Sequence, residues 1–392
     1  MKTACSVLVL VLCMASLRAQ EPAVAPGREA VTTEQVKAGI EKLGTLDFAV
    51  RTEAARTVRR AGAVVAVPLL SAAARAHKDG YVRFRALVLL SGFNAPNTRD
   101  VMSAMLTDKN DRLRAVAYAY FAHNPDPATL PRLIEALSRE ESEFVRPALT
   151  RAIVAHGTDP RARETVLALI MKGQDFFRSA VIEAAGDYRL PYAVAPLSEI
   201  AKLDGPLQDD AVIALGKIGE KRSLDTFAAL QRTAPKTTQP AIAAAICLLG
   251  VNCASHQGYL SDSLKFGTDQ IGYQELVRNA ASALGALGVK GNPAAVTTLL
   301  EQGAPSRDPA RAAIALALGT VALRNTPLLL QVLEKEKDPA PALELLREAF
   351  DMLEEDFEEE RFFAHVRRTY WQSPAASPAR KTAEALIRKL EF

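Results

Sequence analysis

The chain has 392 residues, of which 49% are hydrophobic and only 6% aromatic. An apolar surface made mainly of Ala and Leu favours close-packed helices over a β-rich fold, which depends on β-branched and aromatic residues. The formal net charge of +3 is too small to indicate a nucleic-acid partner, and we expect none.

Residues 1–19 have the pattern of a targeting segment. Lys2 is followed by the apolar run ACSVLVLVLCMAS and then by the small residue Ala19, as in a cleaved secretory signal. The run is too short for an ordinary membrane span, and no later segment predicts one. We therefore expect a signal peptide at residues 1–19, a linker at residues 20–32, and export of the mature chain to the periplasm or out of a bacterial cell.

A hydrophobic residue followed by arginine recurs along the remaining chain, at intervals of 31 to 33 residues with one interval of 38. The arginines are Arg51, Arg83, Arg114, Arg146, Arg178, Arg278 and Arg311, with Asp209 and Pro240 at the two aligned positions between them. A run of small residues follows each position and usually stops at Gly or Asn, which readily adopt the left-handed conformation at a helix end. Between these runs lie others with apolar residues three and four apart, so the period predicts repeated helix pairs.

Four phrases carry a family resemblance: Asp47–Arg51 (DFAVR), Asp79–Arg83 (DGYVR), Leu215–Gly219 (LGKIG) and Leu284–Gly288 (LGALG). They resemble the HEAT-like repeats named for phycobilisome lyases, within the armadillo-like superfamily. The resemblance implies a right-handed α-solenoid that most often serves as a protein-binding scaffold. A repeat array also escapes the size limit of a single core, because each unit needs only its neighbours. We predict an all-α, right-handed α-solenoid of about ten helix pairs over residues 33–353.

The arginine column has two interpretations. Several of its members follow an acid by three or four residues, so they could pair locally or bridge neighbouring repeats as a structural ladder. Alternatively, the column could form a basic stripe that binds phosphates. Loss of Lys2 and Arg18 would leave 46 basic against 45 acidic residues, a net charge of +1. That balance favours the structural ladder.

The interval of 38 residues contains a candidate insertion. It includes Tyr259 and Phe266, and insertions in solenoids often lie on the binding face; the alternative is a longer loop between helices. The only cysteines left after signal cleavage are Cys247 and Cys253. In an oxidising compartment they could form a disulfide or remain buried thiols, and their spacing does not decide between the two.

The second helix of each pair is expected to line the concave side, with exposed positions one, five and eight residues after each anchor. These positions are basic in the first repeat, at Arg56 and Arg59, and mostly small or apolar beyond it. A smooth, mildly apolar groove suits an extended peptide or a partner helix. The predicted partner-binding residues are Phe84, Val88, Arg151, Tyr259 and Phe266.

The C-terminal region departs from the repeat. Asp351–Glu360 (DMLEEDFEEE) holds seven acids in ten residues. The run could bind a cation or a basic partner, but it lacks the spacing of a calcium loop, and a solvated helix face is the favoured interpretation. Ser377 and Pro378 then begin a helix with one apolar seam. Because terminal repeats need a covering element, residues 354–392 are predicted to be a C-terminal helical cap.

The sequence contains no recognisable catalytic pattern. None of its five histidines is followed by Glu, and the H-E-x-x-H, C-x-x-C, G-x-S-x-G and P-loop motifs are absent. His123 and His156 are expected to interact with helix ends. We therefore predict no catalytic, cofactor-binding or metal-binding residues, no cofactor, and a protein or peptide partner for a non-enzymatic scaffold or assembly factor. The alternative, suggested by the family resemblance alone, is a bilin- or cofactor-handling lyase-like enzyme.

Overall fold

The computed structural model describes residues 31–270 and 272–392. The predicted signal peptide and all but the last two residues of the predicted linker lie outside the described residues. Over the described ranges the chain forms twenty-two α-helices, one short 3₁₀ helix and no strand. The predicted all-α solenoid is confirmed.

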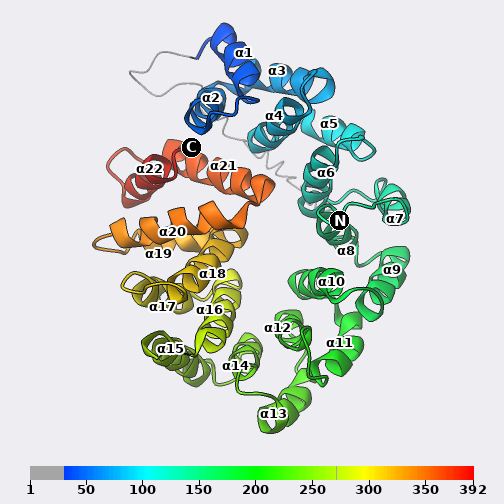
Figure 1. Ribbon diagram of the computed structural model, residues 1–392, viewed down its shortest axis with the longest axis vertical. Helices are drawn as coiled ribbons and strands as arrows, with labels where there is room; N and C mark the ends of the chain where they lie inside the picture. The colour runs from blue at the N-terminus through cyan, green and yellow to red at the C-terminus, as the bar shows by residue number, and fades with distance from the viewer. Residues whose placement is uncertain (1–30, 271) are drawn as a thin grey trace, which may run out of the picture.

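Twenty of the helices form ten consecutive pairs, which run around the molecule in chain order (Figure 1). The first five pairs are α1 (Thr33–Lys42) and α2 (Phe48–Arg60), α3 (Ala63–Ala76) and α4 (Gly80–Phe93), α5 (Thr98–Met105) and α6 (Asp111–His123), α7 (Leu130–Leu137) and α8 (Arg146–Val154), and α9 (Pro160–Met171) and α10 (Asp175–Asp187). The next five are α11 (Val194–Ala201, after the 3₁₀ helix η1, Pro191–Ala193) and α12 (Gln208–Ile218), α13 (Ser223–Thr233) and α14 (Gln239–Leu248), α15 (Cys253–Asp269) and α16 (Gln274–Val289), α17 (Pro293–Gly303) and α18 (Ala310–Arg324), and α19 (Thr326–Leu333) and α20 (Ala340–Leu353).

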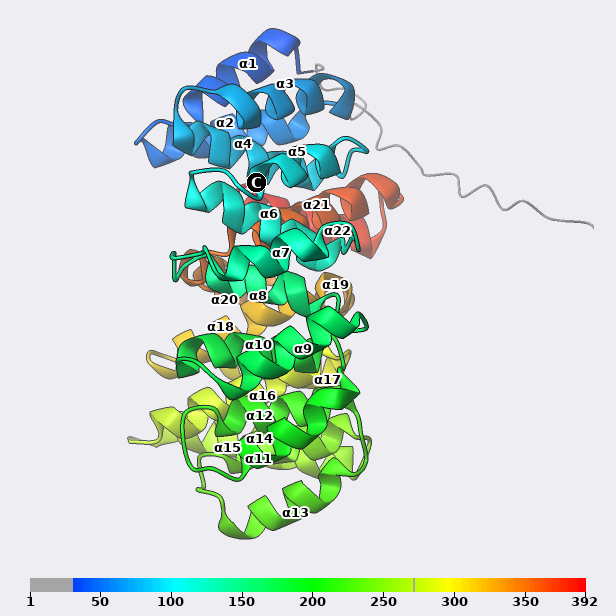
Figure 2. The same cartoon turned by 90° about the vertical axis from the view of Figure 1, so that its right-hand side faces the viewer.

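The two helices of each pair lie in different layers, one inner and one outer. Along the middle of the chain the even-numbered helices from α4 to α18 pack on one another and face inward, while α5, α7, α9 and α11 stack along the outside (Figures 1 and 2). Among the described residues no single helix has the length and hydropathy to cross a membrane, although α18 and α19 pass that test jointly, with a bend of 115° between them.

The acid of the D-x-x-V-R phrase is a helix cap. Asp47 accepts a hydrogen bond from the backbone N–H of Val50 (3.0 Å), and Asp79 accepts one from the backbone N–H of Tyr81 (2.8 Å). Each carboxylate thereby satisfies a backbone donor at the start of an inner helix. In these two repeats the acid of the phrase therefore fixes where the inner helix begins.

The arginine column connects neighbouring pairs. Arg83 donates from Nε to the carbonyl oxygen of Ala74 (3.0 Å), near the end of the preceding helix, and its guanidinium pairs with Asp108 in the next repeat. Three members pair with an acid 25 to 37 residues further along the chain: Arg83 with Asp108, Arg114 with Glu140, and Arg311 with Glu348. Local pairing with an acid three residues earlier occurs at Arg178, with Asp175 (2.9 Å).

Other members of the column make different contacts. Arg51 donates to the carbonyl oxygen of Thr45 (2.9 Å), and the guanidinium of Arg146 lies over the ring of Phe177. Arg278 is exposed on α16. The column is therefore a structural tie at several joints and not one continuous basic stripe.

The glycines of the repeated phrase have two separate roles. A Cβ on Gly216 would lie 2.6 Å from Cα of Ala245, so glycine at this position lets α12 and α14 approach closely. Gly186 has the same relation to Ala214 on the next inner helix. Gly219, with φ of +90°, ends α12 as predicted, whereas Gly92 lies inside α4 and does not end it.

Most of the interval of 38 residues is helical. The alternative expectation of a longer loop between helices is therefore wrong. Residues 253–269 form α15, which has 17 residues. A disulfide joins Cys247, in the last turn of α14, to Cys253, the first residue of α15. The extra residues therefore lengthen the outer helix of this pair.

After the ten pairs, α21 (Asp356–Gln372) and α22 (Pro378–Leu390) turn back toward the beginning of the array. They pack on α18, α19 and α20, and α21 also packs against α4 and α6. Figure 1 shows the C-terminal helices beside the N-terminal pairs, so that the array closes into a ring. The C-terminal segment covers the last pair and also joins it to the first pairs.

Candidate functional site

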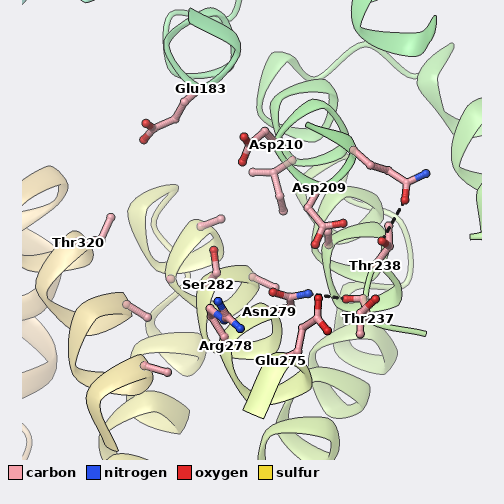
Figure 3. Close-up of a pocket in the computed structure, with 18 of the residues that line it drawn as sticks. Glu183, Asp209, Asp210, Thr237, Thr238, Glu275, Arg278, Asn279, Ser282 and Thr320 are labelled. Atoms are coloured by element: carbon pink, nitrogen blue, oxygen red, sulfur yellow. Dashed lines mark hydrogen bonds between the residues drawn. The ribbon is translucent and has the colours of Figure 1, made fainter. Parts of the chain in front are cut away.

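A cavity of about 920 Å³ lies inside the ring, between α10, α12, α14, α16 and α18 (Figure 3). Its wall includes four polar residues at positions that the repeat phase predicted to be concave: Glu183, Asp210, Lys217 and Asn279. The predicted phase is therefore correct in this part of the ring.

The wall of the cavity is rich in carboxylates. Its acids are Glu183, Asp187, Asp204, Asp209, Asp210 and Glu275, and its basic residues are Lys217, Arg278 and Arg324. Figure 3 shows Glu183 and Asp210 directed into the open space from two neighbouring helices. The expected groove is found in part: small and apolar residues line much of the wall, but the first turn of α12 and one face of α16 add charged side chains to it.

Asp187 is the centre of a charged network at one side of the cavity. Its carboxylate pairs with Arg151 of α8 and with Nζ of Lys217 (2.9 Å). Burial alone would raise the pKa of Asp187, but Lys217 and Arg151 outweigh burial and hold the pKa well below its usual range. Across the ring, Lys290 places its Nζ 3.5 Å from the carbonyl oxygen of Asp187. These charges are mutually compensated.

Asp209 and Asp210 are less completely compensated: Lys217 attracts the carboxylate of Asp210, but this lysine is paired with Asp187. No arginine or lysine of the described residues forms an ion pair with either carboxylate, and burial raises the pKa of both. Oδ1 of Asp209 is buried and accepts no hydrogen bond within the described part of the chain. Two partly buried carboxylates without a cation favour the arrival of a positive group from outside.

The five predicted partner-binding residues are not brought together. Phe84 and Val88 are only 4% and 1% exposed, so the expected exposure of these side chains is wrong: α4 is covered by its neighbours and by α21. Arg151 is engaged with Asp187. Tyr259 and Phe266 are 41% and 49% exposed on α15, away from the cavity wall.

The histidine at the end of α6 is also placed differently from the expectation. Nε2 of His123 lies 2.6 Å from Oε1 of Glu358, on α21, and 2.9 Å from a nitrogen of Arg361. It therefore contacts another helix and not the carbonyls of its own helix end. Within the described residues no group of three or more His, Cys, Asp or Glu side chains is arranged to hold a metal ion.

Comparisons with known proteins found one family model and several solved structures that are similar to parts of the chain. A family model described as HEAT repeats matches residues 67–154 and 98–185. The X-ray structure of the Escherichia coli protein YibA is similar at 19% identity, over 56% of this chain and 82% of that one, with a TM-score of 0.41. A structure titled for a phosphorylation switch between cadherin and β-catenin is similar at 12% identity, over 92% and 95% of the two chains, with a TM-score of 0.29.

No curated protein matches the chain. The family match is to HEAT repeats in general and does not single out the phycobilisome lyase type. The matched residues 67–185 fall within the array of helix pairs, and the described residues form an α-solenoid.

Proposed function

We propose that the protein is an exported scaffold that binds a segment of another protein inside the ring, and that this segment carries a lysine or arginine side chain. The observation that supports this proposal most directly is the pair Asp209 and Asp210, two partly buried carboxylates in a cavity wall with no cation of their own. A basic side chain would supply the missing charge.

The size and enclosure of the cavity suit a short stretch of polypeptide. Its volume of about 920 Å³ is at the upper end of the 300–1,000 Å³ of pockets that bury most of a ligand. Asp209 and Asp210 are partly buried in the cavity wall, which strengthens an ion pair formed there. Arginine would gain further, because its planar guanidinium can bind a carboxylate through two hydrogen bonds. Thr237, Asn279 and Ser282 add polar groups that could bind the backbone of such a segment.

Export is the second part of the proposal. The segment from Lys2 to Ala19 has the order of a cleaved signal, and the disulfide between Cys247 and Cys253 is of the kind that persists in an oxidising compartment. Cell fractionation followed by mass determination of the N-terminus tests it. We expect the protein outside the cytoplasm, with Gln20 as its first residue; an intact N-terminus on a cytoplasmic protein would contradict export.

Binding can be measured with a positional-scanning library of decapeptides. We expect enrichment of Lys or Arg at one or two positions, and depletion of Asp and Glu at the same positions. A selected peptide is then titrated by fluorescence polarisation against the purified protein. The double variant Asp209→Asn, Asp210→Asn should weaken its affinity by about tenfold or more, since removing one partner of a desolvated ion pair is costly.

A matched control separates the cavity from general charge effects. Asp225 is exposed on the outer helix α13, so Asp225→Asn changes the same type of charge outside the cavity and should leave the affinity unchanged. Absence of any preference for cationic residues, or an equal loss of affinity in the Asp225 variant, would contradict the proposed site.

A further inference from the structure

The acidic run near the C-terminus lies in a basic groove of the first repeats. Two ion pairs and one hydrogen bond join α21 to α2, α4 and α6. Glu360 pairs with Arg59 (2.7 Å) and Asp356 pairs with Arg85, while Glu358 is hydrogen-bonded to His123 (2.6 Å), whose pKa is lowered by burial. The interpretation of this run as a solvated helix face is therefore wrong for its second half. The basic concave positions of the first repeat and the acidic run compensate each other across the ring.

The contact is buried and closely fitted. The side chain of Glu360 is 0% exposed and that of Arg59 is 7% exposed. A Cβ on Gly92 of α4 would collide with Oε1 of Glu360, so a side chain at residue 92 would force this carboxylate to move. On the other side of Glu360, Arg367 of α21 lies 3.4 Å away and adds a second cation.

Apolar contacts divide α21 between the two ends of the ring. Phe357 belongs to the hydrophobic core of the N-terminal repeats, where its ring stacks on that of His123. Phe362 and Val366 belong instead to the core formed by the last helix pairs and α22. Helix α21 is thus anchored to the C-terminal end by Phe362 and Val366. It reaches the N-terminal end with charged side chains, with Phe357 and with the ring of Phe363, which lies 5.0 Å from the guanidinium of Arg59.

We propose that α21 is a reversible latch, so that the protein exchanges between a closed ring and an open superhelix. The buried ions of the latch regain hydration when the ring opens, which offsets the ion pairs that they lose. The joints between consecutive repeats also contain ion pairs, such as Arg114 with Glu140, but most of their buried side chains are apolar, so that opening them exposes more apolar surface. The ring therefore opens at the latch before the array unfolds, and salt favours opening by screening the charges.

The latch also reaches the cavity. Arg324, in the last turn of α18, pairs with Glu355 (3.1 Å) and Glu358 (3.0 Å) and at the same time forms part of the cavity wall. Burial acts to raise the pKa of Glu358, but Arg324 and His123 hold it far below its usual range, so this carboxylate stays charged. Withdrawal of α21 from the first repeats shifts the partners of Arg324 and thereby changes one wall of the cavity.

The test is a distance measured across the latch. Lys37 on α1 and Lys381 on α22 are exposed, and nitroxide labels on cysteines at these positions report the separation by pulsed electron paramagnetic resonance. For the labelled protein without further substitutions at low salt, we expect one narrow distribution of distances between the two labels. In Asp356→Arg, where two cations would face each other at Arg85, we expect a broader and longer one. The double variant Arg85→Asp, Asp356→Arg should restore the narrow distribution.

Three further measurements keep the test decisive. Arg347→Asp at the exposed pair with Asp351 of α20 is the matched control and should leave the distance unchanged. Circular dichroism must show unchanged helix content in each variant. If Asp356→Arg loses its helices, a salt titration of the labelled protein decides, because the distribution should broaden toward about 1 M salt, where the Debye length is about 3 Å. A narrow distance that survives both the charge reversal and the salt, or a double variant without rescue, would overturn the latch.

Discussion

The ring contains two kinds of joint, and they are built differently. Consecutive inner helices meet through small and apolar residues, as where Gly216 of α12 lies against Ala245 of α14. The joint that closes the ring relies on ion pairs between residues that are far apart in the sequence. Arg59 and Glu360, for example, are separated by 301 positions. Neighbouring repeats are held together by the chain as well as by packing, whereas the closing joint also bears the entropy of closing a long loop. Charge makes the closing joint specific without making it permanent.

Removing a buried side chain from a stacking joint should have the largest effect. Leu215 is 0% exposed within the core of the N-terminal repeats. Leu215→Ala should lower the free energy of unfolding by about 3 kcal/mol, because it removes apolar contact and leaves a cavity that the neighbouring helices fill only in part. Urea denaturation monitored by circular dichroism measures the change.

The control for this prediction is Leu203→Ala. Leu203 is 64% exposed in the turn before α12, and its truncation should have little effect on unfolding. The loss at Leu215 should also be nearly independent of salt, since no charge is involved. A loss that grows with salt would show that the stacking joints share the electrostatic character of the closing joint.

Adding a methyl group to a stacking joint should have the next largest effect. Alanine is the better helix former, so a glycine to alanine change in a helix with free space should stabilise the protein by about 0.5–1 kcal/mol. Gly258 of α15 offers such space, because a Cβ built there meets no atom within 4 Å. Gly216→Ala should instead lower the free energy of unfolding by about 2 kcal/mol, since its Cβ meets the backbone of α14.

Opposite signs for these two variants, read from thermal unfolding curves, would support close helix approach as the reason for glycine in the repeated phrase. Stabilisation by Gly216→Ala would show that α12 and α14 separate without cost and would remove that explanation.

The stacking joints could be predicted from the sequence, and the closing joint could not. The period of 31–33 residues, the capping Asp47 and Asp79, and the stop at Gly219 are local signals, because each depends on residues within one repeat. No pattern within one repeat predicts the contact between Arg59 and Glu360. The opposite charges of the first concave positions and of the acidic run were visible as departures from the repeat, but their encounter depends on the curvature summed over all the pairs.

The cavity was predicted only in part for the same reason. The repeat phase located Glu183, Asp210 and Lys217 on the inner face, since three-and-four spacing fixes the face of a helix. It failed at Phe84 and Val88, which are covered because α21 returns to α4. Whether an inner position stays open therefore depends on a helix that is remote in the sequence.

A methyl group at Gly92 should affect the closing joint alone. Gly92→Ala places a Cβ where Oε1 of Glu360 lies, so the buried carboxylate must leave its position beside Arg59, which weakens the contact of α21 with the first repeats. We expect the distance distribution between labels at Lys37 and Lys381 to broaden, while the free energy of unfolding changes by about 1 kcal/mol or less, because alanine favours the helix. Gly258→Ala is the matched control and should leave the distance narrow. An unchanged distance in Gly92→Ala would show that the close fit at residue 92 is not required for closure.

The smallest effect should come from the one carboxylate of α21 that opposes closure. Burial, with a further contribution from Asp356, raises the pKa of Glu359 to about 7. A raised carboxyl pKa means that the folded protein binds a proton that the unfolded chain, with its pKa near 4.5, has already released. The resulting penalty is absent below about pH 4.5, grows as the pH rises, and is complete above about pH 7.

Glu359→Gln should therefore raise the free energy of unfolding by about 1 kcal/mol or less at about pH 8 and leave it nearly unchanged at about pH 4.5, after allowance for solvent screening. Glu301→Gln, at an exposed position of α17, is the control and should show no such pH dependence. Thermal unfolding at the two pH values measures the difference, and equal effects of Glu359→Gln at both would mean that this carboxylate is as well solvated in the closed ring as in the unfolded chain.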